Sequence, residues 1–223
     1  MILRPKAFIL DLNGTMIDDM QYHAEAWYDI LNNELQAGLS IDEVKKQMYG
    51  KNEEVLQRIF GKNYFTDEEM KALSFEKERR YQKIYSPHLV LIKGLAEFLE
   101  QSRQHNILLA IGTAAIPFNI DFTLDTLHIR HYFSAIVSAD DVKASKPNPE
   151  TFTKAAQLLH ISAGDCIVFE DAPKGVEAAQ NAGMQSVVIT TMHFENEFKQ
   201  CNNILFFIKD YTDDRLQELL AFS

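Results

Sequence analysis

Short, uninterrupted runs of apolar residues recur along the chain, and they differ from the periodic patterns of its helical stretches. These runs occupy residues 7–10, 107–111, 135–137, 166–169, 187–189 and 204–208. Apolar and polar residues do not alternate within them, which is typical of strands covered on both faces of a parallel sheet. Helical patterns separate most of the runs, at residues 95–103, 149–160 and 175–182. The succession predicts an α/β fold with a doubly wound parallel sheet.

The stretch from residue 16 to residue 88 breaks this alternation and carries only helical patterns. Its first helix is marked by apolar side chains on one face, at Trp27, Ile30, Leu31 and Leu35. Two further helices begin at capping boxes, Ser40 with Glu43 and Thr66 with Glu69. The sequence therefore predicts a core domain of residues 1–15 and 89–223. Residues 16–88 form an inserted all-helical cap of about four helices.

Composition and charge exclude several classes of protein. The net charge of -10 argues against a general binder of nucleic acid or anionic membranes. It does not argue against a small phosphorylated metabolite, because one metal ion and one lysine reverse the local field. The two cysteines form no disulfide framework, and Cys166 lies in an apolar run typical of a buried, inert thiol.

The apolar runs also bear on where the protein works. None approaches the ~20 residues that a membrane-spanning helix needs, and the run at 7–10 is too short for a secretory signal. We expect a cytoplasmic protein, and a monomer rather than an oligomer.

Polar side chains gather where the predicted strands end. Asp11 follows the first strand, Thr113 the second, and Glu170 with Asp171 the fourth, while Lys146 opens the helix after the third. The carboxyl ends of parallel strands meet at one edge of the sheet, where ligands bind. Carboxylates suit Mg²⁺, and a carboxylate held beside phosphorus can attack it. The sequence predicts magnesium-dependent phosphoryl transfer through an aspartyl-phosphate.

Four motifs in this order resemble those of the haloacid dehalogenase superfamily. They are Asp11-Leu-Asn-Gly-Thr15, Thr113, Lys146-Pro-Asn-Pro149, and Glu170-Asp171 with Gly175. Their order and spacing agree over the whole chain, and the helical insertion resembles the C1 cap of the β-phosphoglucomutase-like subfamily. The resemblance implies a Rossmann-like core and Mg²⁺ as cofactor.

The resemblance also implies a role for each matching residue. Asp11 corresponds to the nucleophile and a metal ligand, Asp171 to the second side-chain ligand, and Glu170 to a group near the metal, directly or through water. The residue at position 13 gives its backbone carbonyl to the metal.

Four other positions correspond to the phosphate site. Thr113 and Lys146 match the phosphate-binding pair, and the Ala114 amide assists them. Gly14 lets backbone amides approach the phosphate because it has no side chain.

Asn13 departs from the motif, which has a second aspartate there as the acid/base catalyst. Asparagine can donate a hydrogen bond but cannot deliver and take back a proton, and losing a general acid/base costs ~10²–10⁴-fold in rate. Three interpretations stay open. Asn13 is an engineered substitution that silences turnover, a natural feature of a slow enzyme that uses another base such as His23, or the mark of a phosphate-binding pseudoenzyme.

The cap is expected to choose the substrate. Four of its residues correspond to substrate-binding positions, namely His23, Lys51, Asn52 and Lys77. Glu53 stands where the mutases have an arginine for the distal phosphate. Lys77 corresponds to a second distal-phosphate residue, although its run of charges is also typical of a solvated helix face.

These features favour a phosphatase of small phosphorylated metabolites, such as sugar phosphates or pyrophosphate, over a β-phosphoglucomutase. A catalytically silent phosphate-binding protein is the alternative from another class. A hydrolytic dehalogenase needs no Mg²⁺, so Glu170 and Asp171 argue against it.

Overall fold

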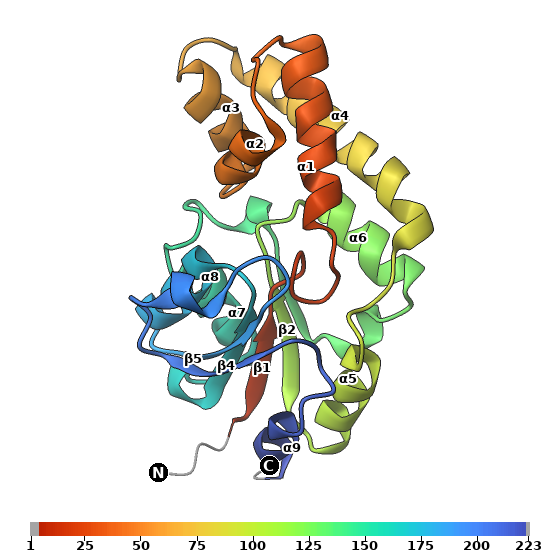
Figure 1. Ribbon diagram of the computed structural model, residues 1–223. Helices are drawn as coiled ribbons and strands as arrows, with labels where there is room; N and C mark the ends of the chain where they lie inside the picture. Colours follow the sequence, from red (N-terminus) through yellow and green to blue (C-terminus); the bar gives the residue numbers. More distant parts are fainter. Residues whose placement is uncertain (1–4, 222–223) are drawn as a thin grey trace. The chain divides into compact units, whose positions relative to one another are not determined.

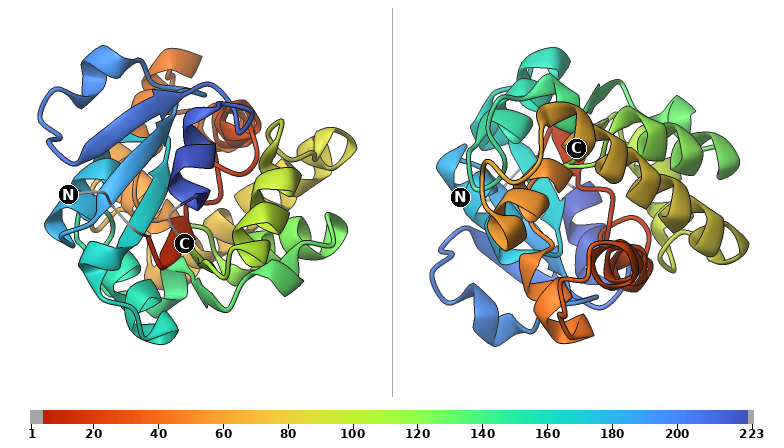
Figure 2. Two further views of the ribbon diagram at one scale, coloured as in Figure 1. Left: turned by 90° about the horizontal axis from the view of Figure 1, so that it is seen from below. Right: turned by 90° about the horizontal axis from the view of Figure 1, so that it is seen from above.

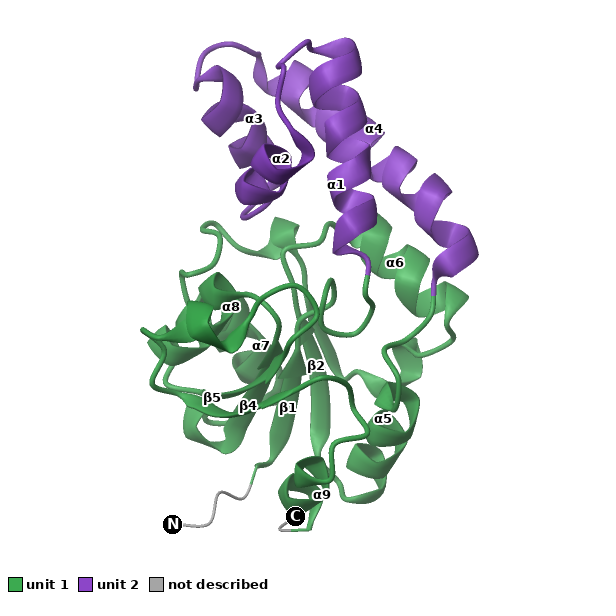
Figure 3. Ribbon diagram, viewed as in Figure 1, with its two compact units in different colours: residues 1–18, 90–223 green, residues 19–89 purple. Residues whose placement is uncertain are grey.

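The computed structural model describes residues 5–221, which divide into two compact units (Figure 3). Unit 1 takes in the chain up to Asp18 and again from Val90, and unit 2 is Asp19–Leu89. The helical insertion was expected at residues 16–88, whereas unit 2 begins at Asp19 and ends at Leu89. Met16 and Ile17 are fully buried, and Ile17 forms a β-bridge with Leu91, so both residues belong to unit 1.

Unit 1 is built on a parallel sheet whose strand order is β3-β2-β1-β4-β5-β6 (Figure 1). The strands are β1 (Ala7–Leu10), β2 (Leu108–Gly112), β3 (Ala135–Val137), β4 (Cys166–Glu170), β5 (Gln185–Ile189) and β6 (Ile204–Ile208). Leu10 is level with Ile111 of β2 and with Phe169 of β4, so the three strands end together. The strand order reverses direction at β1 and β4, and ligands bind beside such a switch point. The predicted doubly wound sheet is confirmed.

The central strands β1 and β4 are buried along their whole length, so both of their faces are covered, which explains their continuous apolar sequences. Phe8 and Leu10 of β1 contribute to one hydrophobic core, and Ala7 and Ile9 contribute to another on the opposite face. The first core includes side chains of α5 (Leu95–Gln104), α6 (Pro117–Thr126) and α9 (Arg215–Leu220); the second includes α7 (Glu150–Leu159) and α8 (Pro173–Asn181). Figure 2 shows the sheet of unit 1 from two further directions.

Short 3₁₀ helices complete the described residues of unit 1. They are Arg130–Tyr132, Ala139–Asp141, Ala163–Asp165 and Glu195–Phe198.

Unit 2 is entirely helical and has a core of its own. Its helices are α1 (Met20–Tyr28), a π-helical turn (Asp29–Glu34), α2 (Ile41–Gln47), α3 (Asn52–Phe60), α4 (Asp67–Tyr85) and a 3₁₀ turn (Ser86–His88). Both predicted capping boxes form, at Ser40 and Thr66. Trp27, Ile30 and Leu31 are buried together with side chains of α2, α3 and α4.

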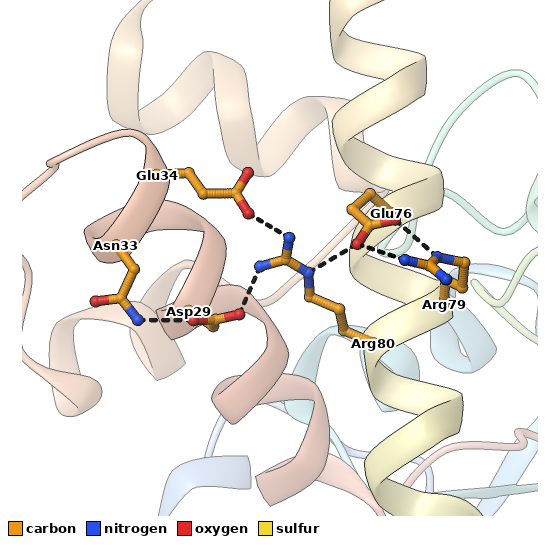
Figure 4. A network of polar contacts seen from close by, with 6 residues as sticks. All are labelled: Asp29, Asn33, Glu34, Glu76, Arg79 and Arg80. Atoms are coloured by element: carbon orange, nitrogen blue, oxygen red, sulfur yellow. Dashed lines mark hydrogen bonds and ion pairs between the residues drawn. The ribbon is translucent and has the colours of Figure 1, made fainter.

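Arg80 of α4 fixes the π-helical turn (Figure 4). Its guanidinium donates to Asp29 across 2.5 Å and to Glu34 at the other end of the turn. A third bond, of 2.9 Å, joins it to Glu76 on its own helix.

Within residues 5–221, no helix is both long and apolar enough to cross a membrane.

Candidate active site

The carboxylate of Asp11 lies at the end of β1 and is held by a lysine. Asp11 continues the pairing of its strand, because its amide donates to the carbonyl of Phe169 across 3.0 Å. Lys146, in the loop before α7, donates from Nζ to Asp11 Oδ1 across 2.6 Å and to Glu170 Oε1 across 2.8 Å. Burial acts to lower the pKa of Lys146, but the charges of Asp11 and Glu170 raise it overall. The lysine is therefore a permanent cation beside the predicted nucleophile.

Glu170 is fixed by the start of α8. Its Oε2 accepts hydrogen bonds from the amides of Asp171 and Ala172, each across 2.8 Å. A methyl group on Gly175 would lie 1.7 Å from Glu170 Oε1, so only glycine allows this close approach. Both oxygens of Glu170 are engaged by protein groups, which favours an indirect role near a metal over direct ligation.

Asp171 lies against the loop that follows β1. Thr15 Oγ1 donates to its Oδ1 across 3.3 Å, and a methyl group on Gly14 would lie 2.1 Å from its Oδ2. Burial raises the pKa of Asp171 well above its usual range, and repulsion from Glu170 and Asp11 raises it further, against the opposing effect of Lys146. These surroundings therefore disfavour the charged form of Asp171 relative to an aspartate in water.

The remaining core positions of the prediction lie on the same strand ends. Thr113 directly follows β2, is buried, and accepts the amide of Ala115 on Oγ1 across 3.1 Å. Ala114 beside it is exposed. Asn13 is half-buried in the loop between β1 and unit 2, and it forms a β-bridge with Ile17.

These groups fit a hard divalent cation by their charge. Asp11, Glu170 and Asp171 bring three carboxylates together with the single cation of Lys146, which leaves an excess of negative charge in a buried place. Among residues 5–221, no three His, Cys, Asp or Glu side chains are arranged to hold a metal ion by themselves. Mg²⁺ usually takes one or two carboxylates and completes its shell with water and substrate phosphate. Asp11 and Asp171, which directly follow strands β1 and β4, bring oxygen atoms of the kind that such an ion takes.

Three of the four predicted cap residues, His23, Asn52 and Lys77, belong to one polar network in unit 2 that includes Glu78. Lys77 Nζ lies 2.6 Å from His23 Nδ1 and donates to Glu78 Oε1 across 3.0 Å. Asn52 Nδ2 donates to the same Glu78 oxygen across 2.6 Å. Lys77 is only 3% exposed, so a solvated helix face is the wrong interpretation for it. The fourth residue, Lys51, precedes α3, and its amide donates to Glu54 across 3.0 Å.

Several residues of these clusters carry no motif of their own in the sequence. Asp19, Glu78 and Tyr81 acquire their contacts only in the fold. For Asp19 a signal exists, because it stands four residues before His23 and a helix brings such positions together. Tyr211, whose hydroxyl donates to the carbonyl of Thr15 across 3.0 Å, gave no signal.

Comparison with known proteins identifies the family. Residues 8–189 match the model of the haloacid dehalogenase-like hydrolases, and the chain belongs to this family. A β-phosphoglucomutase of Bacillus subtilis (strain 168) is 34% identical over 190 residues, which cover 82% of each chain. A fructose-1-phosphate phosphatase of Escherichia coli (strain K12) is 30% identical over 191 residues, covering 82% of this chain and 96% of that one.

A solved structure shows the same fold over nearly the full length. The crystal structure of a family IA, variant 3 hydrolase of the haloacid dehalogenase class from Entamoeba histolytica superposes with a TM-score of 0.86 at 27% identity, covering 97% of this chain and 98% of that one. The family and the helical-cap fold predicted from the four motifs are confirmed.

Proposed function

We propose that this chain is a magnesium-dependent phosphatase of small phosphorylated metabolites, such as sugar phosphates or pyrophosphate, with slow turnover. The observation that carries the proposal is the Asp11 carboxylate, held 2.6 Å from Lys146 Nζ at the edge where the central strands end. A carboxylate in this position is a nucleophile for phosphorus. The relatives named as a sugar phosphatase and a phosphoglucomutase support the same class of substrate.

Each core residue has a task in the proposed reaction. An oxygen of Asp11 attacks phosphorus, and the bond from phosphorus to the leaving oxygen breaks with its electron pair on that oxygen. Water then attacks the aspartyl-phosphate, which restores Asp11 and releases inorganic phosphate. Thr113, Lys146 and the amides at Gly14 and Ala114 hold the phosphate oxygens, and Lys146 lowers the repulsion between nucleophile and substrate.

Asp11, Asp171 and the carbonyl of Asn13 would hold Mg²⁺, with Glu170 acting through Lys146 and the start of α8. Bound Mg²⁺ supplies charge neutralisation to the phosphate oxygens. The cap residues His23, Lys51, Asn52 and Lys77 would bind the part of the substrate that leaves.

Asn13 limits the rate in this proposal. Its carboxamide donates a hydrogen bond to the leaving oxygen but cannot supply the proton that this oxygen needs, nor take one from the attacking water. The backbone carbonyl of residue 13 is unchanged by the side chain, so metal binding is retained.

Two alternatives share the site. A β-phosphoglucomutase, favoured by the Bacillus relative, would pass the phosphoryl group to a sugar hydroxyl rather than to water. A silent phosphate-binding protein, favoured by Asn13, would bind the ligand and not turn it over.

Phosphate release from a panel of metabolites tests the proposal, with Mg²⁺ and with EDTA. We expect slow, EDTA-sensitive release by the chain with Asn13 and a rise of at least about 10²-fold in Asn13→Asp. The same change at the exposed Asn63 is the control and should have no effect. Conversion of β-glucose 1-phosphate to glucose 6-phosphate would favour the mutase. No turnover by Asn13→Asp, together with tight binding, would favour the binding protein.

A further inference from the structure

The loop that follows β1 is bonded to the ends of two other strands, β4 and β5. In the sheet, β4 lies between β1 and β5. Thr15 Oγ1 donates to Oδ1 of Asp171, which directly follows β4, across 3.3 Å. Thr191, two residues beyond β5, donates from Oγ1 to the carbonyl of Gly14 across 2.7 Å. The hydroxyl of Thr191 therefore fastens a loop of the first strand to the end of the fifth.

The bond from Thr191 fixes the peptide that connects Gly14 with Thr15. A carbonyl oxygen lies in one rigid plane with the amide of the next residue, so holding the Gly14 oxygen also orients the start of Thr15. Both residues of this peptide border Asp171. Thr15 contacts Oδ1 through its hydroxyl, and Gly14 lies so near Oδ2 that an added methyl group would be 2.1 Å away. The peptide that Thr191 holds is therefore in contact with both oxygens of the carboxylate.

The backbone of Gly14 depends on restraints of this kind. Its φ is +75°, a conformation that glycine adopts about as readily as the ordinary ones. Glycine alone does not select this conformation, so bonds from the surroundings have to select it. The Thr191 hydroxyl supplies one such bond at Gly14, and the Tyr211 hydroxyl supplies another at the carbonyl of Thr15, across 3.0 Å.

We propose that Thr191 is a positioning residue of the Mg²⁺ site. By holding the Gly14 carbonyl, it keeps the loop against Asp171 and so keeps the carboxylate in the orientation that binds the ion. The inference rests on the proposed function, because it takes Asp171 to be a ligand of Mg²⁺. Groups that orient a metal ligand matter almost as much as the ligand, and losing one typically reduces metal affinity about 10–100-fold. The four sequence motifs do not include Thr191.

The neighbouring Thr190 makes the same kind of bond to a different element. Its Oγ1 donates to the carbonyl of Ile208 in β6 across 3.2 Å. In the sheet, β6 lies on the side of β5 that faces away from β1. Both threonines are half-buried. Valine at either position removes one hydroxyl from the end of β5 and keeps a branched side chain, but only Thr191→Val releases the Gly14 carbonyl.

Calorimetric titration of the whole protein with Mg²⁺, in the absence of substrate, tests the proposal. We expect Thr191→Val and Thr191→Ala to bind the ion at least about tenfold more weakly than the unsubstituted protein. Thr191→Ser keeps the hydroxyl, and Thr190→Val keeps the bond to Gly14, so both should stay within about threefold of the unsubstituted affinity. The Tm in EDTA measures general damage to the fold, and it should fall by similar amounts in the two valine variants.

The possible outcomes separate this inference from the proposed function. Unchanged Mg²⁺ affinity in Thr191→Val and Thr191→Ala would overturn the inference and leave the proposed phosphatase standing. Equal losses in Thr190→Val and Thr191→Val would also overturn it, because any damage to the end of β5 would then suffice. Weaker binding by Thr191→Val, restored in Thr191→Ser, would support the inference even if no phosphatase activity were found. Failure of the unsubstituted protein to bind Mg²⁺ would overturn both.

Discussion

The hydroxyl of Tyr211 donates a hydrogen bond to the carbonyl oxygen of Thr15 across 3.0 Å, and so ties the C-terminal segment to the loop after β1. The amide of Tyr211 also donates to the carbonyl of Lys93 across 2.9 Å. Thr191 holds the neighbouring carbonyl of Gly14 through its own hydroxyl, across 2.7 Å. The loop with Asn13 and Gly14 therefore has its carbonyls held by side chains from residues far along the chain.

Tyr211→Phe should destabilise the protein by about 1–2 kcal/mol, because the buried Thr15 carbonyl loses its donor. Burial raises the pKa of Tyr211, and Asp11 and Asp171 add to this, so the hydroxyl remains a donor over the working pH range. Phosphate release should fall about three- to tenfold, since the loop carries the carbonyl that we propose as a ligand of Mg²⁺. Urea unfolding and the malachite-green assay measure the two effects. Tyr64→Phe, at a tyrosine that is 66% exposed, is the control.

Gly14→Ala should abolish the response of the protein to Mg²⁺. Gly14 has φ of +75°, and the new methyl group would meet Asp171 Oδ2 at 2.1 Å and displace that carboxylate. Gly38→Ala is a matched control, because Gly38 has φ of +69° but no atom within 4 Å of the added methyl. Both variants lose about 1 kcal/mol from backbone strain. Only Gly14→Ala should lose the Mg²⁺-induced rise in Tm, and a normal rise would contradict the expected donor set.

Much of the core could be predicted from the sequence because its signals are local. Apolar runs marked all six strands, and the groups at their ends met because parallel strands finish at one edge. The start of β5 was missed by two residues, since Gln185 and Ser186 are polar and become strand only through pairing with β4 and β6. The apolar face that marks the first helix of the cap does not predict its π-helical turn, Asp29–Glu34, at which Asp29 and Glu34 accept hydrogen bonds from Arg80 of α4.

Long-range polar contacts could not be predicted in this way. Tyr211 and Thr15 are 196 positions apart, and a tyrosine near the C-terminus gives no indication of its partner. Lys77 corresponds to a distal-phosphate residue of the family, but its run of charges is also typical of a solvated helix face. Its burial depends on the packing of α4 against α1, which the run does not reveal. Sequence patterns specify which face of an element is apolar, but they do not specify which polar groups are enclosed with it.

His23→Gln distinguishes the interpretations of Asn13. If His23 is the substitute base, this variant should reduce the slow turnover of the chain with Asn13 by about 10²-fold and affect Asn13→Asp far less. His160→Gln, at an exposed histidine, is the control. Equal loss in both backgrounds would mean that His23 acts by shaping the polar network of unit 2.

Asp171→Asn should stabilise the metal-free protein while removing its response to Mg²⁺. The raised pKa of Asp171, caused by burial and then by repulsion from Glu170 and Asp11, means that folding favours its protonated form. This contribution to stability is complete below the ordinary pKa of 3.8 and is lost as the pH rises through the raised value. At neutral pH the uncharged asparagine of the variant avoids this loss of folding stability. The gain over the aspartate is about 1–2 kcal/mol, or roughly 3–6 °C in Tm.

The pH dependence of the stability difference between Asp171→Asn and the unsubstituted protein shows whether the charge of Asp171 causes it. The advantage of Asp171→Asn in EDTA should grow as the pH rises from the ordinary pKa of 3.8 through the raised pKa of Asp171, because only the aspartate becomes charged at this position. Asp140→Asn, at an exposed aspartate, should show no such trend. In Mg²⁺ the order should reverse, since the wild type gains a ligand-linked rise in Tm that the variant lacks. If Asp171→Asn were less stable than the wild type in EDTA, the carboxylate would be stabilised by its surroundings, and the need for a cation at this site would lose its electrostatic support.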